Sequence, residues 1–427
     1  MSTADRIVVV EGVRTPFVRA RTVFDSMPAA SLGGVALRET VARSGIDPAL
    51  IEEVYYGIVS APADGPNVSR EALFDSGLPS EIPCTTLNRY CASAIEAVAG
   101  AMGKISSGQI DIALAGGVES LSNVRAVFSK AATDHFQKAA RLKSFGQTLG
   151  WLSQFKLSYF KPLAPGISEP TTGLTMGQSA DLMARLFEIS REDQDAYAAE
   201  SHHKAAAAWD NGFYQNHVVP VATPKGVVID RDTDIRSDTS PEKLARLKPV
   251  FYKDGTITAG NASPLTDGAS ALLLMKESKA KELGLQPLGT IRAIANAAVD
   301  IKKEPLLIGP VYAIPRLLKM AGVEWSNIDL IEMHEAFAGQ VLSTIKALES
   351  DSFAKDKLGL DRAIGTVDRS ILNVNGGSIP LGHPFGATGG RVILQALHEL
   401  RNRRKSLGLI SVCAAGGMGA VALVEAL

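Results

Sequence analysis

Cysteine is scarce in this sequence, and that shortage excludes two kinds of protein. Only three cysteines occur in 427 residues, at positions 84, 91 and 413. An odd number this small does not make a disulfide framework, and the spacing offers no pair of metal ligands. We therefore predict a reducing, cytoplasmic environment.

Net charge and long apolar runs are also lacking. The formal net charge is −1, from 44 Lys and Arg against 45 Asp and Glu, so the overall charge does not favour nucleic-acid binding. No run of 18 apolar residues occurs, so we expect no transmembrane helix and only peripheral membrane contact. Residues 1–17 also lack the pattern of a secretory signal.

Short apolar strands alternate with amphipathic helices along most of the chain, which indicates an α/β fold. A helix, a glycine, a strand and a Gly-Gly pair follow one another at residues 91–117 and again at 388–417. In both segments the glycine after the helix lies eight residues before the Gly-Gly pair. This repeated order predicts a duplicated fold.

Residues 121–257 interrupt the alternation and are predicted to form an inserted, mostly helical domain. Ser190, with acidic residues after it, predicts the start of one of its helices. The predicted domains are thus an N-terminal half (1–120 and 258–279), the insertion (121–257) and a C-terminal half (280–427).

Part of this insertion, residues 121–161, is basic and aromatic. It carries seven Lys and Arg against one Asp, with seven aromatic residues among them. Such a segment can dock a partner or lie on an anionic membrane surface. The alternative is a pair of helices that covers a core and has a solvated basic face.

Cys91 is the first candidate for chemistry, because a helix is predicted to begin beside it. The partial positive charge and free N–H groups of a helix N-terminus stabilise a thiolate and lower the thiol pKa. The alternative is a small core residue, since free cysteine is often buried.

Three further segments combine reactive side chains with glycine or a strand end. His383 lies in the glycine-rich segment 373–390, where so many glycines suggest a close approach to a ligand or another backbone. Cys413 precedes glycines that allow a sharp hairpin with exposed N–H groups. His334 directly follows an apolar strand, where α/β folds place ligands; the alternative is a hydrogen-bond network with Glu335 at a helix start.

Taken together, these segments resemble the thiolases, in family order and over nearly the whole chain. The matching segments are Cys-x-Ser at 91–93, Gly-Asn-Ala-Ser at 260–263, His-Glu-Ala-Phe at 334–337, Asn-Gly-Gly at 375–377, Gly-His-Pro-x-Gly-Ala at 382–387 and Cys-x-x-Gly-Gly-x-Gly at 413–419. Most thiolases have Asn where this chain has His334. The His form resembles the β subunit of the fatty-acid oxidation trifunctional complex.

The resemblance implies a fold and an assembly. The fold would be two βαβαβαββ halves, each with a mixed five-stranded sheet, stacked as five αβαβα layers with an inserted loop domain. The assembly would be a homodimer or tetramer. In the complexes, the partner is an α subunit with hydratase and dehydrogenase activities.

The resemblance also implies roles for five residues in thiolysis of 3-ketoacyl-CoA. Cys91 would be the acyl-carrying nucleophile, His383 its base and an oxyanion donor, and Cys413 the acid that protonates the enolate. His334 would hold a water at the oxyanion. The backbone N–H of Ala415, where many thiolases have glycine, would complete a second oxyanion hole with that of Cys91.

Coenzyme A is therefore the expected substrate, with no metal or redox cofactor. Ser263 and Met176 match positions that contact the pantetheine arm in the family. A biosynthetic acetoacetyl-CoA thiolase is the main alternative. A ketoacyl synthase would lack Cys413 in its glycine turn, and a non-catalytic CoA-binding scaffold would have lost Cys91, His383 or Cys413.

Overall fold

The computed structural model describes residues 5–161 and 168–427 and divides the chain into two compact units. The large unit comprises residues 1–123 and 176–427, and the small unit comprises residues 124–175. The separate unit, residues 124–175, thus covers only part of the predicted insertion, residues 121–257. Residues 176–257 belong to the large unit because their helices α6 (Met176–Leu186) and α7 (Arg191–Asp210) pack against α11 (Ala338–Leu348).

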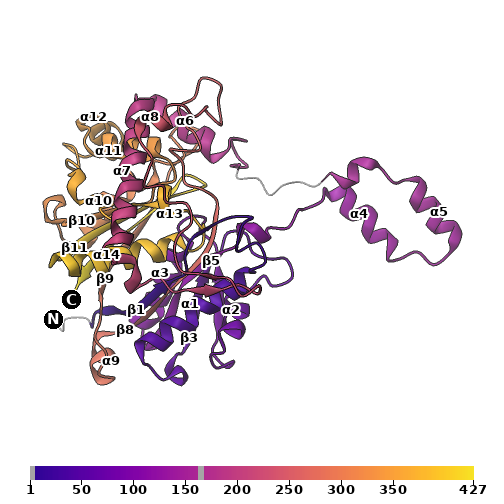
Figure 1. The fold of residues 1–427 in the computed structure, drawn as a ribbon, viewed down its shortest axis with the longest axis horizontal. Coiled ribbons are helices and arrows are strands. Elements are labelled where there is room, and N and C mark those ends of the chain that lie inside the picture. The colour runs from indigo at the N-terminus through magenta and orange to yellow at the C-terminus, as the bar shows by residue number, and fades with distance from the viewer. Residues whose placement is uncertain (1–4, 162–167) are drawn as a thin grey trace. The chain divides into compact units, whose positions relative to one another are not determined.

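Five main strands form the sheet of the N-terminal half (Figure 1). They are β1 (Ile7–Arg14), β3 (Glu53–Gly57), β4 (Cys84–Leu87), β5 (Ile112–Glu119) and β8 (Thr266–Lys276). Their order is β4-β3-β5-β8-β1, with β3 parallel to β4 and β5, and β8 antiparallel to both its neighbours. A short strand, β2 (Val18–Arg19), pairs with β8.

The C-terminal half repeats this order. Its strands are β9 (Gly289–Ala298), β10 (Leu330–Met333), β11 (Leu407–Ala414) and β12 (Met418–Ala426). They run β10-β11-β12-β9, with β10 parallel to β11 and β12 antiparallel to β11 and β9. In place of a fifth strand, a single parallel bridge joins Ile331 to Leu372. The predicted duplication is confirmed, although two residue pairs between β1 and β9 join the two sheets.

Helices cover the sheets in three layers. The outer helices of the N-terminal half are α1 (Ala29–Ser44) and α2 (Val68–Ser76), the central helices are α3 (Ser93–Ser106) and α14 (Thr388–Arg403), and the outer helices of the C-terminal half are α10 (Gly309–Ala321) and α11. Neighbouring side chains of a strand point to opposite faces. Leu114 accordingly packs in the outer cluster, while Ala113 and Ala115 pack in the central one.

The remaining strands and α-helices of the large unit are short, apart from α6 and α7. They are β6 (Val221–Ala222), β7 (Val228–Ile229), α8 (Pro241–Leu244), α9 (Glu277–Glu282), α12 (Asp351–Phe353) and α13 (Ser378–Leu381). The predicted start of α7 is confirmed, because the Ser190 hydroxyl accepts a hydrogen bond from the N–H of Asp193.

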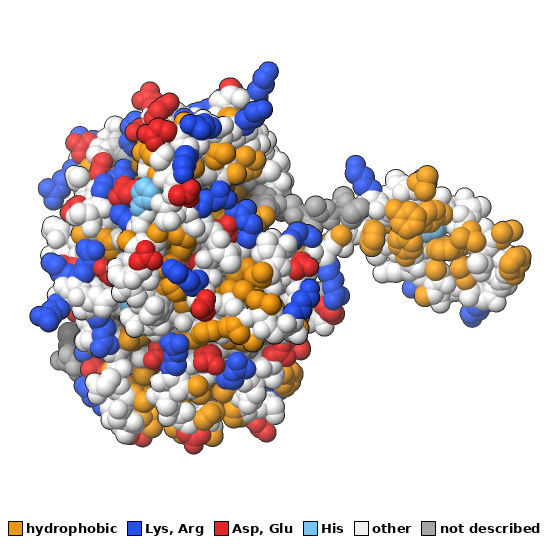
Figure 2. Space-filling model, in the orientation of Figure 1, with side chains coloured by type: hydrophobic (Ala, Val, Ile, Leu, Met, Phe, Trp, Pro, Cys, Tyr) orange, Lys and Arg blue, Asp and Glu red, His pale blue; other side chains and the backbone are white. Residues whose placement is uncertain are grey.

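The small unit contains α4 (Lys130–Ala139) and α5 (Phe145–Ser153), which pack around His135. The Trp151 ring stacks on His135 with 4.7 Å between centroids, and its indole N–H donates to the His135 carbonyl. Apolar side chains gather on the visible surface of this unit (Figure 2), and α5 has no buried residue. No described helix is both long and apolar enough to cross a membrane.

Candidate active site

Cys91 lies on a strained turn between β4 and α3. Tyr90, just before it, has a positive φ of 49°, which side-chain-bearing residues rarely adopt. The turn is held by hydrogen bonds: Asn88 Oδ1 accepts from the N–H of Tyr90, and Ser93 Oγ accepts from Arg89 and donates to the Tyr90 carbonyl. Strain maintained by surrounding bonds is common at functional sites.

His383 lies just before α14, and its backbone N–H donates to the Pro264 carbonyl. Its Nδ1 is 2.7 Å from Thr388 Oγ1. The glycines that follow allow two backbones to meet: a Cβ on Gly389 would lie 2.7 Å from the backbone nitrogen of Ile95 in α3. The expected close approach of this segment is therefore to another backbone, and it places His383 near the start of α3.

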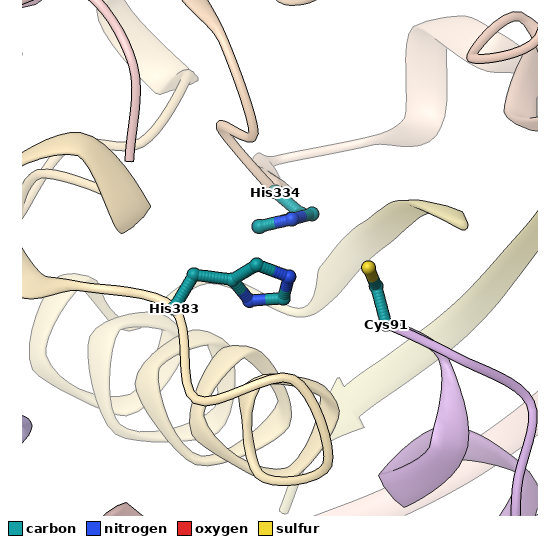
Figure 3. Close-up of side chains that lie close together, drawn as sticks. All are labelled: Cys91, His334 and His383. Atoms are coloured by element: carbon teal, nitrogen blue, oxygen red, sulfur yellow. The ribbon is translucent and has the colours of Figure 1, made fainter. Parts of the chain in front are cut away.

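His334 follows β10, fully buried, and its Nδ1 is 2.7 Å from Ser378 Oγ. Its ring centroid is 4.0 Å from that of His383. Figure 3 shows both imidazoles and the Cys91 sulfur converging from three different segments of the chain, and one ligand-type atom of each lies within 4.8 Å of the others. Thiol and imidazole are groups that bind zinc, so this cluster could hold a metal ion; the expected absence of one stays a prediction.

Burial sets the protonation states in this cluster. It raises the pKa of Cys91 to about 12, and the backbone N–H groups of Ala415 and Cys91 offset only part of this rise. The predicted lowering of this pKa is wrong, because desolvation outweighs the helix N-terminus, which begins two residues later at Ser93. Burial lowers the pKa of His383 to about 3 and that of His334 well below its usual range. These shifts favour a thiol and two neutral imidazoles in the resting site, although Cys91 itself is only half-buried.

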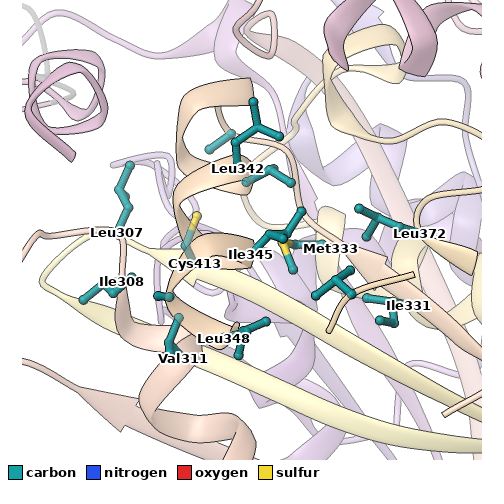
Figure 4. Close-up of a cluster of buried hydrophobic side chains, with 14 of the residues drawn as sticks. Leu307, Ile308, Val311, Ile331, Met333, Leu342, Ile345, Leu348, Leu372 and Cys413 are labelled. Atoms are coloured by element: carbon teal, nitrogen blue, oxygen red, sulfur yellow. The ribbon is translucent and has the colours of Figure 1, made fainter. Parts of the chain in front are cut away.

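Cys413 lies outside this three-residue cluster, near the end of β11. It is 2% exposed and packs among apolar side chains of the C-terminal half, with Leu307 and Leu342 nearby in Figure 4. Burial, and then the charge of a Cys91 thiolate, raise the pKa of Cys413 well above its usual range. A protonated thiol close enough to be affected by Cys91 is suited to donate a proton.

Beyond Cys413, the chain turns from β11 to β12 through Gly416 and Gly417, whose φ values are +74° and +71°. Ala415 is not among the described residues with positive φ, so alanine is compatible with this position. Its N–H is directed to the Cys91 sulfur, where it lowers the thiol pKa. The glycine hairpin predicted from the sequence therefore places a backbone donor at the Cys91 sulfur.

The two predicted pantetheine contacts lie on neighbouring segments. Ser263 is half-buried, and its N–H donates to the Ala336 carbonyl, in the loop that follows His334. Met176 begins α6 and packs against the core of the C-terminal half. Their roles toward CoA stay predictions.

Glu335 forms the hydrogen-bond network considered as an alternative for the His-Glu segment. Its carboxylate accepts from Tyr197 Oη and Asn373 Nδ2, each at 2.8 Å, and from the N–H of Ile379 at 3.0 Å. Ser201 Oγ donates to both of its oxygens. Glu335 thus fixes the loops around the histidines.

Glu119, at the end of β5, is a site residue that sequence analysis did not identify. Its buried carboxylate accepts from the N–H groups of Val59, Ser60 and Gly386, at 2.9–3.0 Å, and links the two halves beside the site. Burial raises the pKa of Glu119 to about 7. The available signal was its place at the end of an apolar strand.

A cysteine beside two imidazoles, on a duplicated α/β fold, is the arrangement expected of an enzyme with a cysteine nucleophile. Two family models match, described as the thiolase N-terminal domain over residues 7–278 and the thiolase C-terminal domain over residues 285–426. The chain belongs to the thiolase family of acyltransferases.

Individual proteins agree with the family models. The chain is 44% identical over 423 residues to the 3-ketoacyl-CoA thiolases of Yersinia enterocolitica and Serratia proteamaculans, with 99% of this chain and 97% of each relative covered. The crystal structure of the Bacillus anthracis acetyl-CoA acetyltransferase is 33% identical, with a TM-score of 0.84 over the full length of both chains. The similarity therefore extends over the whole chain.

Proposed function

We propose that the protein is a 3-ketoacyl-CoA thiolase, an acetyl-CoA C-acyltransferase that acts in the last step of fatty-acid β-oxidation. The main support is the Cys91 thiol, which lies beside two neutral imidazoles and receives backbone N–H groups at its sulfur. The names of the Yersinia and Serratia relatives support the same substrate class.

In the first half-reaction, the Cys91 sulfur attacks the 3-keto carbon while its proton moves to His383 Nε2. The backbone N–H groups of Cys91 and Ala415 stabilise the alkoxide that forms, and such donors each typically contribute about 3–4 kcal/mol. The C2–C3 bond then breaks, which leaves an acyl group on Cys91 and the enolate of acetyl-CoA. Cys413 protonates the enolate carbon, and acetyl-CoA leaves.

In the second half-reaction, CoA enters and gives its thiol proton to the Cys413 thiolate. The CoA sulfur attacks the Cys91 thioester, and the shortened acyl-CoA leaves. The His383 imidazolium returns its proton to the Cys91 sulfur, so each group ends in its starting state. CoA is a substrate here, with Ser263 and Met176 proposed along its pantetheine arm, and no step requires a resident cofactor.

Replacement of the nucleophile tests this function. For Cys91→Ala we expect thiolysis of 3-ketohexadecanoyl-CoA to fall about 10⁴-fold or more, with an unchanged circular dichroism spectrum. The matched control is Cys84→Ala, which removes another half-buried thiol and is expected to stay active. Turnover by Cys91→Ala close to that of the wild type would refute the assignment.

A biosynthetic acetoacetyl-CoA thiolase is the second candidate, because the Bacillus neighbour is an acetyl-CoA acetyltransferase. The chemistry is reversible, so the substrate preference distinguishes the two. We expect a higher kcat/KM for 3-ketohexadecanoyl-CoA than for acetoacetyl-CoA. The opposite preference, with efficient condensation of acetyl-CoA, would establish the biosynthetic role.

We further propose that the small unit docks on an anionic membrane surface. Among its described residues, six large apolar side chains are at least half exposed: Val127, Phe145, Leu149, Leu152, Leu157 and Phe160. Phe145 and Leu157 are 83% and 84% exposed. Helix α5 carries no charged residue, and lysines lie on both sides of it at 143 and 156. Apolar insertion flanked by basic residues is how peripheral helices bind anionic lipid.

Vesicle sedimentation tests this docking. We expect the protein to sediment with phosphatidylglycerol vesicles more than with phosphatidylcholine vesicles, and Phe145→Ser with Leu157→Ser to reduce the bound fraction at least several-fold. Phe74→Ser, an exposed phenylalanine on α2, serves as the control. Equal sedimentation of all variants would contradict the proposal, and binding to a hydratase/dehydrogenase subunit that the double variant loses would assign the surface to that partner instead.

The assembly and cellular location complete the proposal. We propose a cytoplasmic homodimer or tetramer of the trifunctional β-subunit type, supported by three free cysteines and the His334-Glu-Ala-Phe sequence. Analytical ultracentrifugation at low micromolar concentration should give a dimer or tetramer, and a monomer would contradict it. Co-purification with a hydratase/dehydrogenase chain tests the complex.

A further inference from the structure

Both histidines of the site bond a hydroxyl through Nδ1 and present a free Nε2. The hydroxyl of Thr388 is 2.7 Å from His383 Nδ1, and that of Ser378 is 2.7 Å from His334 Nδ1. Both Nε2 atoms are buried without a hydrogen-bond partner in the described part of the chain. Because a neutral imidazole carries one proton, the hydroxyls determine whether each Nε2 is a donor or an acceptor.

The hydrogen bonds of Thr388 give His383 a basic Nε2. Thr388 Oγ1 donates to the Pro384 carbonyl at 3.1 Å, since a carbonyl oxygen only accepts. The hydroxyl proton is thus used, and Thr388 can only accept from His383 Nδ1. His383 therefore carries its proton on Nδ1, and its Nε2 lone pair is free to take the proton of Cys91.

The hydrogen bonds of Ser378 give His334 the opposite tautomer. Arg391, which is fully buried, donates from Nη2 to Ser378 Oγ at 2.8 Å, and a guanidinium never accepts. Among the described residues, the acceptor within reach of the Ser378 hydroxyl proton is His334 Nδ1. A buried hydroxyl proton without a partner would cost about 1–3 kcal/mol, so Ser378 donates, and His334 carries its proton on Nε2.

We propose that Ser378 and Arg391 are positioning residues that hold His334 as an Nε2–H donor to the oxyanion, while Thr388 holds His383 as the base. This inference rests on the proposed thiolysis. His334 then donates directly to the enolate oxygen and needs no intervening water, unlike the role predicted from the sequence. Once His383 has taken the Cys91 proton, both Nε2 atoms are donors, so the donors for the enolate oxygen are in place before the C2–C3 bond breaks.

Arg391 also favours the neutral state that this arrangement requires. Burial is the main cause of the lowered pKa of His334 and His383, and the Arg391 charge adds to it. An imidazolium would have two N–H groups and no lone pair for Cys91. The buried Arg391 guanidinium thus fixes the tautomer of His334 through Ser378. Its charge also disfavours protonation of His334 and His383.

Serine variants test the role of Ser378 in turnover. For Ser378→Ala we expect kcat for thiolysis to fall about 10²–10³-fold with little change in KM, the loss expected when one oxyanion donor is removed. Ser378→Thr keeps the hydroxyl and should recover most of the activity. The matched control Ser343→Ala removes another buried hydroxyl of the C-terminal half, which donates to the backbone carbonyls of Met183 and Gly339. An unchanged kcat in Ser378→Ala, or a loss that Ser378→Thr shares, overturns the proposal.

Nuclear magnetic resonance tests the tautomers without turnover. In enzyme labelled with ¹⁵N-histidine, we expect His334 to show a protonated Nε2 and His383 a protonated Nδ1, assigned with His334→Gln and His383→Gln. Ser378→Ala should shift the His334 signals toward the Nδ1–H form and leave those of His383 in place. A protonated Nδ1 on His334 in the wild type overturns the inference. If thiolysis is absent but the tautomers are as stated, the proposed function fails while the hydrogen-bond assignment stands.

Discussion

At the scale of single residues, desolvation governs the site more than the helix that follows it. The Cys91 thiol stays protonated at rest because burial disfavours the thiolate, and the neighbouring imidazole is neutral for the same reason. In the proposed mechanism, attack therefore requires transfer of the Cys91 proton to His383. We therefore expect the resting thiol to react slowly with other electrophiles.

The pH dependence of alkylation tests this protonation state. With a pKa of about 12, the thiolate fraction of Cys91 rises about tenfold per pH unit below that value. We expect the rate of iodoacetamide labelling at Cys91, followed by peptide mass spectrometry, to rise in this way from pH 7 to 10. A plateau reached below pH 8 would instead indicate a thiolate stabilised by the helix N-terminus.

Glu332, on β10, should make stability depend on pH. Its carboxyl is fully buried, and burial raises its pKa to about 8. Between pH 5 and 8 the folded chain therefore holds a proton that the unfolded chain has released, so stability falls as pH rises, by at most about 1.4 kcal/mol per unit. Glu332→Gln cannot titrate. Urea titrations give the free energy of unfolding of the variant minus that of the wild type. We expect this difference to be more favourable to the variant at pH 8.5 than at pH 5.5. The same difference at both pH values would contradict the prediction.

At the scale of elements, the two central helices meet closely because glycine begins one of them. Gly389, in the first turn of α14, packs against Ile95 of α3 without a side chain between them. This contact sets the distance between Cys91 before α3 and His383 before α14. The glycine-rich segment thus positions His383 relative to Cys91 through the close packing of α14 on α3.

Two glycine substitutions separate this packing effect from helix propensity. In Gly389→Ala, the new Cβ would lie 2.7 Å from the Ile95 nitrogen, and we expect a loss of about 1–3 kcal/mol in the free energy of unfolding. The control is Gly103→Ala in α3, where nothing lies within 4 Å of the added Cβ. It should gain about 0.5–1 kcal/mol from helix propensity. Urea titrations measure both, and equal stability of the two variants would contradict the packing argument.

Most of these elements could be predicted from the sequence, because their signals are local. The repeated order of helix, glycine, strand and Gly-Gly depends on hydrophobic periodicity and turn chemistry over short windows. The boundary of the insertion could not be placed in this way: residues 176–210 look like neighbouring helices of the insertion, yet they pack on the C-terminal half. The surface against which an amphipathic helix packs depends on residues far away in the sequence, so a local pattern does not reveal it.

At the scale of the whole molecule, the two halves share one core layer. The central cluster combines side chains of α14, such as Ile393 and Leu397, with Leu272 and Leu274 of β8 in the N-terminal half. Each half alone would leave one face of its sheet open to water. The duplicated halves are therefore structurally interdependent.

This interdependence predicts that the C-terminal half does not fold alone. We expect the isolated fragment 280–427 to lack a cooperative thermal transition by circular dichroism, because the apolar face of α14 would be exposed. The full chain should show one transition that includes both halves in calorimetry. A fragment that unfolds cooperatively would show that the halves are separate folding units.

The sequence by itself determined the duplicated α/β topology, the family and the choice of Cys91, His334, His383 and Cys413 as candidate site residues, because these depend on local pattern and motif. Only the tertiary structure decided the protonation states of those groups and the tautomers of the two histidines. Desolvation depends on everything packed around a group, so it reversed the predicted pKa shift of Cys91. The tautomers of the histidines likewise depend on hydroxyl and guanidinium groups that only the folded chain brings to them.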